Sequence, residues 1–572
     1  SALGASSLRL ETTGDYNTAG GYSALENFVG GSTNTAFGFK CLEGTEGSST
    51  ASNNSAYGAY ALYKTTTGSL NTALGLSALE QNTTGDYNTA AGHAALQKNL
   101  GANANSSFGY QALEENTTGT QNEAFGYTTM SANTTGNYNA AFGSLAAVSL
   151  NGGNRNTFCG NSAGSGVTTG SDNTLLGYKA GNSCTTAANN VAIGKEALYQ
   201  NSTGGENVAI GREAFYATST NSQNVAIGYR AGYANTASDV VFVGHECGYA
   251  NVGSRNTAVG HRAAMQTTTG TDNTSMGLGA LRTNTTGSYN TALGASALFT
   301  NSTGGQNVAV GQLALNQFTG SGTVAVGNQA LQDLTNGVGN VAVGHDTGRE
   351  ITTGDYNTIL GYAAMDATGT DVGYNVAIGS GSLGSSSYAG NENTMVGHNA
   401  GHNMTTGGSN VCMGTNAGDN ITTGSNNVII GKDSDVDNAG RIRAVVIGQA
   451  AGTVAADNTF RAIGDNGVYN SANSSTWSTT SDIRIKKDVV DNNQGLDVIK
   501  QIRVRNFKYR TEEEIDAPEL QQYPVKHIVV NDPKLQIGAI AQEFEEILPD
   551  SIMTTDWGVK TINTDPLVWH LV

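Results

Sequence analysis

The sequence predicts an all-β repeat rod, a parallel β-solenoid with about 17 residues in each coil, followed by a small C-terminal α/β domain. Three observations predict it. A motif of Asn, then Thr or Val, two apolar residues and Gly recurs through residues 1–448. Glycine is abundant, with 77 copies in 572 residues, whereas only 13% of the residues are charged. All five prolines lie after the repeats, where the composition becomes that of an ordinary globular domain.

The repeat has a nearly constant length. It reads NTALG at 71–75, NVAIG at 190–194 and NVIIG at 427–431; its last glycine occurs 27 times between Gly4 and Gly448, and 20 of the 26 steps are 17 residues long. Seventeen residues are too few for a helical hairpin repeat and suit one solenoid coil. We expect a strand at the Asn-to-Gly segment, a second strand near the Ala-Leu pair that follows, and glycine-rich turns. At a spacing of ~4.8 Å, the stacked coils would be about 130 Å long.

The strand segment is apolar on both of its faces. In NVAIG, three consecutive residues are apolar, which is typical of a parallel strand buried on both sides. A coil of 17 residues has one interior of its own, so other copies of the chain are the simplest cover for the second face. We therefore expect a symmetric homo-oligomer packed along these strands. The asparagine that opens each strand is expected to form stacked amide ladders or turn hydrogen bonds.

This pattern resembles the head of trimeric autotransporter adhesins, a trimeric left-handed parallel β-roll, and the related shafts of phage tail fibres. The resemblance covers residues 1–448, although the period here is longer than the usual head repeat. It implies a homotrimer and a left-handed coil.

The composition argues against several classes of function. A net charge of -18 argues against binding nucleic acid or an anionic membrane through a basic surface. No run of 18 apolar residues and no opening signal peptide appears, so membrane insertion is not expected. The five cysteines are far apart and form no CxxC pair, and we expect small buried thiols.

Histidines and tyrosines recur at fixed places in the repeat. Tyrosine, phenylalanine, leucine and lysine share the position of the histidines in other coils, so we interpret it as a solvent-facing or packed ladder position and expect neither a metal site nor a cofactor. Tyrosines in the turns are interpreted as a packing ladder, with stacking on sugars as the alternative. The histidines are His93, His245, His261, His345 and His398, and the tyrosines are Tyr16, Tyr87, Tyr138, Tyr289 and Tyr356.

After a connector at 449–480, the sequence changes to ordinary α/β usage. Its periodicity predicts two helical segments, two strands and the start of a last helix. We expect that last helix to be incomplete, and both ends of the chain to be cut, since Ser1 lies inside a repeat. The segments are a helix at 495–502, a strand at 504–510, a strand running into a short helix at 535–550, and a helix start at 566–572.

Four motifs of residues 481–572 resemble the intramolecular chaperone domain of phage endosialidases, tail spikes and tail fibres. They are SDIRIKKD, IKQIRVRNFKY, IGAIAQEFEEILPD and KTINTDPLVWHLV, and they occur in the order of that family. A longer, polar stretch at about 511–534 is interpreted as a surface insertion. Members of the family trimerise, help a β-rich fibre to assemble in register, and are released by self-cleavage at the Ser–Asp bond that opens the domain.

Carried over to this chain, the resemblance implies a scissile bond between Ser481 and Asp482, with Ser481 as catalytic serine and Lys486 as its base. A partly desolvated lysine can lose its proton and activate a hydroxyl. Because Ser481 Oγ reaches its own carbonyl only through a strained four-membered ring, either a neighbouring chain supplies the nucleophile or the serine acts indirectly. Lys487 is the alternative base. At most, the chain is a single-turnover auto-endopeptidase, with no external substrate expected.

The leading hypothesis is a trimeric phage or virus tail-fibre shaft, extracellular and part of the virion, which attaches to a host. Its C-terminal chaperone would template the trimer and cleave itself off at Ser481–Asp482. The expected partners are its own copies and a host cell-surface glycan or protein receptor, contacted by the rod or by loops such as 41–54. A cellular trimeric adhesin or extracellular filament is the alternative. A polysaccharide depolymerase is less favoured, because residues 1–448 contain no non-repetitive catalytic domain.

Overall fold

The chain divides into two compact units, Ser1–Thr479 and Thr480–Val572. Each unit is described by itself below. The computed structural model describes residues 1–366, 371–385, 387–450, 456–462, 468–470, 478–479, 496–511, 514–515, 534–554 and 559–562.

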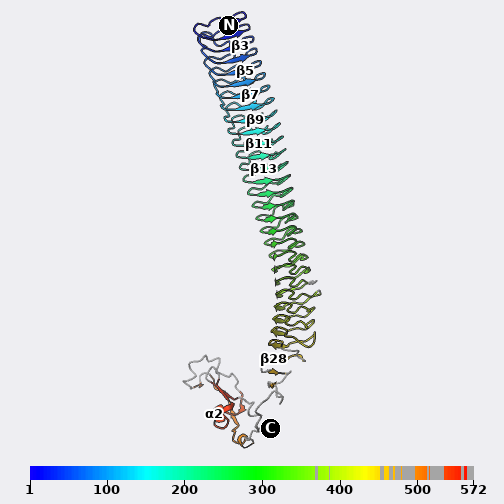
Figure 1. Cartoon of the computed structure of the whole chain (residues 1–572). Coiled ribbons are helices and arrows are strands. Elements are labelled where there is room, and N and C mark those ends of the chain that lie inside the picture. Colours follow the sequence, from blue (N-terminus) through cyan, green and yellow to red (C-terminus); the bar gives the residue numbers. More distant parts are fainter. Residues whose placement is uncertain are drawn as a thin grey trace. The chain divides into compact units, whose positions relative to one another are not determined.

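The first unit is a parallel β-solenoid in which every coil contributes one short strand (Figure 1). The repeat and the parallel strand predicted from the sequence are therefore confirmed. The strands are β1 (Ala2–Leu3), β2 (Thr18–Gly20), β3 (Thr35–Phe37), β4 (Ser55–Tyr57), β5 (Thr72–Leu74), β6 (Thr89–Ala91), β7 (Ser106–Phe108), β8 (Glu123–Phe125), β9 (Ala140–Phe142), β10 (Thr157–Cys159), β11 (Thr174–Leu176), β12 (Val191–Ile193), β13 (Val208–Ile210), β14 (Val225–Ile227), β15 (Val241–Val243), β16 (Thr257–Val259), β17 (Thr274–Met276), β18 (Thr291–Leu293), β19 (Val308–Val310), β20 (Val324–Val326), β21 (Val341–Val343), β22 (Thr358–Leu360), β23 (Val376–Ile378), β24 (Thr394–Val396), β25 (Val411–Met413), β26 (Val428–Ile430) and β27 (Val445–Ile447).

Successive strands pair in parallel, one repeat apart. In the pairing of β12 with β13, Val191 lies opposite Val208 and Ile193 lies opposite Ile210. The middle residue of each strand points into the coil, as does the buried Ala192, whereas the first and third residues point outward. The interior of a coil is thus narrow and takes one strand residue.

The repeat glycine ends each strand because no other residue fits there. All 27 of these glycines have φ between 128° and 146°, a backbone region that L-residues rarely enter. A Cβ on Gly194 would also lie 2.6 Å from the carbonyl oxygen of Gly211 in the next coil. Both the dihedral angle and the coil spacing therefore require glycine.

The expected second strand near the Ala-Leu pair is wrong: this segment is bonded between coils but is not extended. Glu196 and Leu198, two and four residues after Gly194, both have positive φ. The N–H of Glu196 therefore donates backward to the carbonyl of Tyr178, at 2.9 Å, and the N–H of Leu198 donates forward to that of Ala214, also at 2.9 Å. Alternating left-handed residues make the ladder without a β conformation.

The position of Leu198 explains why leucine and glycine alternate at this place in the repeat. In coils that carry leucine four residues after the repeat glycine, the middle residue of the strand is often alanine, as at Ala192. In the preceding coil the place is held by Gly181, and the middle strand residue is Leu175. A Cβ on Gly181 would lie 2.5 Å from Leu175 Cδ1. One bulky side chain thus fills the interior of each such coil, and it comes either from the middle of the strand or from the position four residues after the repeat glycine. This agrees with the close packing of protein interiors.

Two ladders of buried asparagine run through the coils, as predicted for the asparagine at the start of each strand. Asn207 donates from its backbone N–H and its Nδ2 to Asn190 Oδ1, at 3.0 and 3.1 Å, and Nδ2 also donates to the carbonyl of Asn221. Of the 26 coils that contain this position, 23 carry asparagine. A second ladder joins Asn99 Nδ2 to Asn82 Oδ1 at 2.7 Å. Each side chain links two coils.

The sheet changes direction at the C-terminal end of this unit, within the predicted connector. β28 (Phe460–Ala462) still pairs in parallel with β27, but β29 (Val468–Asn470) and β30 (Ser478–Thr479) add in antiparallel order. These strands cover the edge of the last coil, which otherwise exposes unpaired backbone groups.

The second unit contains short α and β elements, most at the predicted places. The expected strand and helix at 535–550 are confirmed by β32 (Gln536–Gly538) and α2 (Ala541–Glu545). Arg505 of β31 (Arg505–Phe507) forms an ion pair with Glu543 of α2, at 2.7 Å. The expected helix at 566–572 and most of the expected insertion at 511–534 lie outside the described residues. The elements are α1 (Leu496–Ile499), β31 (Arg505–Phe507), β32 (Gln536–Gly538), α2 (Ala541–Glu545), η5 (Pro549–Ser551), β33 (Ile552–Thr554) and β34 (Lys560–Ile562).

The packing of Leu175 against Gly181 predicts a compensating pair of substitutions. Gly181→Leu overfills its coil and should lower stability by about 1–3 kcal/mol. Leu175→Ala empties the coil and should cost about 2–5 kcal/mol. The double variant reproduces the Ala192–Leu198 arrangement and should recover most of the loss in thermal unfolding followed by circular dichroism. Additive losses in the double variant would contradict this account.

Candidate functional site

The outward-pointing third residue of each strand forms a continuous apolar ladder, here called the outer ladder. It contains an apolar or aromatic residue in 26 of the 27 strands, and none of these side chains is buried. It comprises Leu3, Phe37, Tyr57, Leu74, Ala91, Phe108, Phe125, Phe142, Cys159, Leu176, Ile193, Ile210, Ile227, Val243, Val259, Met276, Leu293, Val310, Val326, Val343, Leu360, Ile378, Val396, Met413, Ile430 and Ile447.

Side chains stack along the solenoid surface. In the outer ladder, the rings of Phe108 and Phe125 are 4.6 Å apart, and those of Phe125 and Phe142 are 5.0 Å apart. His245 and His261, which directly follow repeat glycines, stack at 4.9 Å and so occupy a packed ladder position, as expected. Within the described residues, no group of three or more His, Cys, Asp or Glu side chains is close enough to hold a metal ion.

Cys159 is the exception among the five cysteines, which were all expected to be buried. It belongs to the outer ladder and is exposed, whereas the other four are buried. Burial raises the pKa of the thiols of Cys41, Cys184 and Cys247 to about 12, and raises that of Cys412 as well. Reactivity toward thiol reagents therefore reports on the outer ladder.

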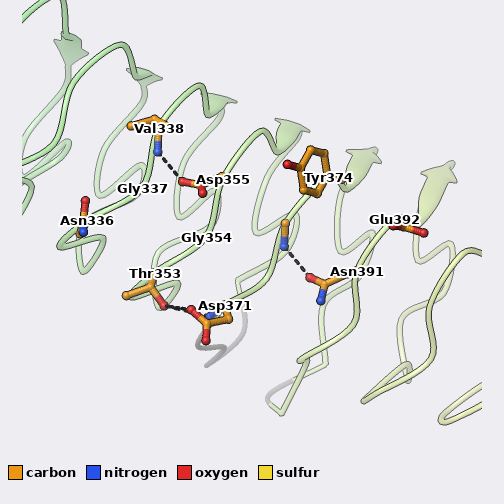
Figure 2. Close-up of a pocket in the computed structure, with 11 residues that line it drawn as sticks. Asn336, Gly337, Val338, Thr353, Gly354, Asp355, Asp371, Tyr374, Asn391 and Glu392 are labelled. Atoms are coloured by element: carbon orange, nitrogen blue, oxygen red, sulfur yellow. Dashed lines mark hydrogen bonds between the residues drawn. The ribbon is translucent and has the colours of Figure 1, made fainter.

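A groove of about 570 Å³ lies across the turns that precede strands β21 to β24 (Figure 2). Four successive coils contribute side chains or backbone to it, so the groove follows the direction of stacking. Its lining combines one aromatic ring, three carboxylates, two amides and exposed backbone. The lining residues are Asn336, Gly337, Val338, Thr353, Gly354, Asp355, Asp371, Gly373, Tyr374, Asn391 and Glu392.

Hydrogen bonds between coils hold the polar lining in place. The N–H of Val338 donates to Asp355 Oδ1 at 2.7 Å, and the N–H of Gly373 donates to Asn391 Oδ1 at 2.6 Å. Thr353 Oγ1 donates to Asp371 Oδ1 at 3.1 Å. Each of these three side chains accepts a hydrogen bond from the preceding coil through one oxygen atom. Among the described residues, the second carboxylate oxygen of Asp355 has no hydrogen-bond partner.

Gly373 interrupts a row of hydrogen bonds in which turn side chains accept from backbone N–H groups of the preceding coil. At its place, six residues before the repeat glycine, most coils carry a Ser, Asp, Asn or Thr side chain that accepts from the preceding coil; Ser69 N–H donating to Asp86 Oδ1 at 2.7 Å is an example. Gly373 has no such side chain. The N–H of Asp355 accordingly has no acceptor among the described residues.

Tyr388 supports this region from inside. It lies in a coil that spans 18 residues between Gly379 and Gly397, and it is buried. Its hydroxyl donates to Asn375 Oδ1 at 2.7 Å and accepts from Asn393 Nδ2 at 2.8 Å. It thus bridges the side-chain amides of the two asparagines, while the backbone N–H of Asn393 still donates directly to Asn375 Oδ1 at 3.0 Å. Burial raises the pKa of the Tyr388 phenol, which keeps its proton available for donation.

The tyrosine ladder expected in the turns is wrong at most of its positions. Tyr289 is 63% exposed and Tyr87 is also exposed, and neither has a ring neighbour in the part of the chain that the structure describes. Tyr356 is the exception; its ring lies 5.4 Å from that of Tyr374, which is 62% exposed and borders the groove.

The residues predicted for self-cleavage, Ser481, Asp482 and Lys486, lie outside the described residues, as does Lys487. Their roles remain predictions. The loop at 41–54 is described and does not line the groove. Among the described residues, no helix has the length and apolar character to cross a membrane.

Comparison with protein families identifies the second unit. Residues 481–553 match the family described as chaperone of endosialidase. Searches of curated proteins and of solved structures found no match. A long parallel β-solenoid followed by this chaperone segment fits the class of phage tail-fibre and tail-spike proteins. The matched residues contain SDIRIKKD, IKQIRVRNFKY and IGAIAQEFEEILPD, whereas KTINTDPLVWHLV lies beyond them.

The position of Tyr388 predicts the effect of removing its hydroxyl. Tyr388→Phe leaves buried amide groups of Asn375 and Asn393 with one partner fewer, which should lower stability by about 1–3 kcal/mol. Chemical denaturation should detect this loss, and hydrogen exchange should localise it to the coils of β23 and β24. An exposed tyrosine gives the control: Tyr289→Phe should leave both measurements unchanged. Equal effects of the two variants would contradict the buried role of Tyr388.

Proposed function

We propose that this chain is a subunit of a homotrimeric phage tail fibre that attaches to a host surface. The solenoid is its shaft, and the outer ladder is the face that three copies share. The segment from Ser481 templates the trimer and then separates from the shaft. The fibre is an extracellular part of the virion.

The outer ladder carries this proposal. Monomeric proteins rarely expose a contiguous apolar patch larger than a few hundred Å². With coils ~4.8 Å apart, a ladder of 27 strands is about 130 Å long and exceeds that size even at one side chain in width. Identical chains offer identical ladders, and a closed symmetric assembly covers all of them.

A shaft of this kind needs a device that sets register. Neighbouring coils are so alike that chains shifted by one coil would lose few contacts, and long-range parallel pairing is slow. A trimeric clamp at one end fixes the register once, and the coils then pair in order. The match of residues 481–553 to the chaperone of endosialidase supports this role. A cellular adhesin could use the same shaft, but this chaperone segment favours the fibre.

Release of the clamp would be a hydrolysis. One water adds across the Ser481–Asp482 peptide bond, so that Ser481 ends in a carboxylate and Asp482 becomes a new amino terminus. The Ser481 hydroxyl of another copy attacks the Ser481 carbonyl, and Lys486 accepts the hydroxyl proton and passes it to the departing Asp482 nitrogen. Water then hydrolyses the ester formed between the two copies, which leaves the Ser481 carboxylate and restores the attacking hydroxyl.

The shared outer ladder predicts that Cys159 is protected in the assembled protein. Native mass spectrometry should give a trimer, in which a maleimide labels Cys159 slowly. Phe142 and Leu176 flank Cys159 in the ladder, and lysines there would place unpaired charges in the interface, at a cost of several kcal/mol. Phe142→Lys with Leu176→Lys should therefore speed labelling at least about tenfold.

Tyr138→Lys is the matched control, since this exposed residue lies in the same coil as Phe142 but in its turn. It should leave the labelling rate unchanged. A monomeric mass, or rapid labelling of Cys159 in the wild-type protein, would overturn the shared ladder.

Self-cleavage predicts a difference on a denaturing gel. The wild-type protein should yield a fragment that ends near residue 481, and Ser481→Ala should remain full length. Lys486→Met should also block cleavage, whereas Lys487→Met should not. A wild-type chain that stays intact under all assembly conditions would refute cleavage without affecting the trimer.

A further inference from the structure

We propose that the groove formed by the turns before β21 to β24 binds a polysaccharide of uncharged or amino sugars. This inference rests on the proposed attachment function and gives it a location and a class of ligand.

The length and direction of the groove suit a chain-like ligand. It crosses four coils, and the coil spacing of ~4.8 Å is close to the length of one pyranose unit in an extended chain. Each coil can therefore face one sugar. The volume of about 570 Å³ is in the range of ligand-binding pockets.

The lining offers both kinds of contact that sugars make. The exposed ring of Tyr374 provides a flat apolar face for the C–H side of a pyranose. Asp371 and Glu392 present carboxylates that accept from hydroxyl or ammonium groups. The Asp355 N–H and the amide of Asn391 provide donors. At Gly373, a ligand oxygen can take the place of the side chain that other coils use as acceptor.

Charge selects among sugars. Asp355, Asp371 and Glu392 are acidic, and no lysine, arginine or histidine is among the described residues that line the groove. An acidic sugar would place its carboxylate among these groups, where like charges repel. The groove therefore excludes acidic polysaccharides, such as polysialic acid, although the chaperone segment matches a family described for endosialidase.

Isothermal titration of the full-length protein tests this proposal with soluble tetrasaccharides. The panel contains uncharged chains of glucose, mannose, galactose or N-acetylglucosamine, one amino-sugar chain of glucosamine, and one acidic chain of sialic acid. At least one uncharged or amino-sugar probe should bind, and the acidic probe should not. Absence of binding by the whole panel, or binding of the acidic probe as tight as the others, would overturn the proposal.

Two pairs of variants separate the groove from the rest of the surface. Gly373→Ser should restore the interrupted row of hydrogen bonds and preserve stability, yet weaken sugar binding at least about fivefold. Tyr374→Ala should weaken sugar binding by at least about the same factor. Ala188→Ser and Tyr289→Ala introduce the same side chains at equivalent positions of other coils and should leave affinity unchanged.

Equal binding by Gly373→Ser and wild type, or equal weakening by the control variants, would refute the groove as the site. Native mass of the same samples keeps the two proposals apart. A trimer that binds no probe overturns the groove alone, and a monomer that binds overturns the shared ladder alone.

Discussion

Stacking of buried amide groups from coil to coil is the interaction on which the solenoid depends. Each asparagine in the ladder of Asn190 and Asn207 accepts two hydrogen bonds from the next coil and donates to a turn carbonyl. Without a neighbour, these buried groups would be unpaired, at about 1–3 kcal/mol each. One coil alone is therefore unstable, and stability comes from the array. At the C-terminal end of the solenoid unit, the antiparallel strands β29 and β30 continue the sheet beyond β28.

Features that every coil repeats could be predicted, and features of single coils could not. The strand was predictable because Asn and Gly mark its two ends, with Gly194 as the example. The second strand was wrong because positive φ at Leu198 is not visible in an Ala-Leu pair; alternation of leucine with glycine at that place was the available signal. The end strands were missed because they have no repeat. The groove was missed because the periodic pattern does not mark it: Gly373 lacks an acceptor side chain, but so do Gly205 and Gly305 at equivalent positions, and its coil has 18 residues.

The strand sequence changes along the shaft in a way that bears on assembly. No strand from β2 to β11 begins with valine, whereas 11 of the 16 strands from β12 to β27 do. This first residue points outward like the outer ladder, so the outward face becomes more apolar toward the chaperone segment in sequence. In the proposed trimer, the most apolar contacts would involve the coils nearest in sequence to the chaperone segment, and the more polar Thr-rich coils would pair afterward. Register is then set where an error would cost most.

Regular stacking and ligand binding make opposite demands on the same turns. In a regular coil, Ser69 N–H and its equivalents are satisfied within the solenoid, so no polar backbone group remains for a ligand. At Gly373 one acceptor is missing, and the N–H of Asp355, a residue that lines the groove, has no acceptor among the described residues. The cost of this interruption is limited, because Tyr388 and the asparagines inside the coil keep the core ladder intact. On the proposed binding role, a repeat protein would place a site on its surface turns while its interior remains regular.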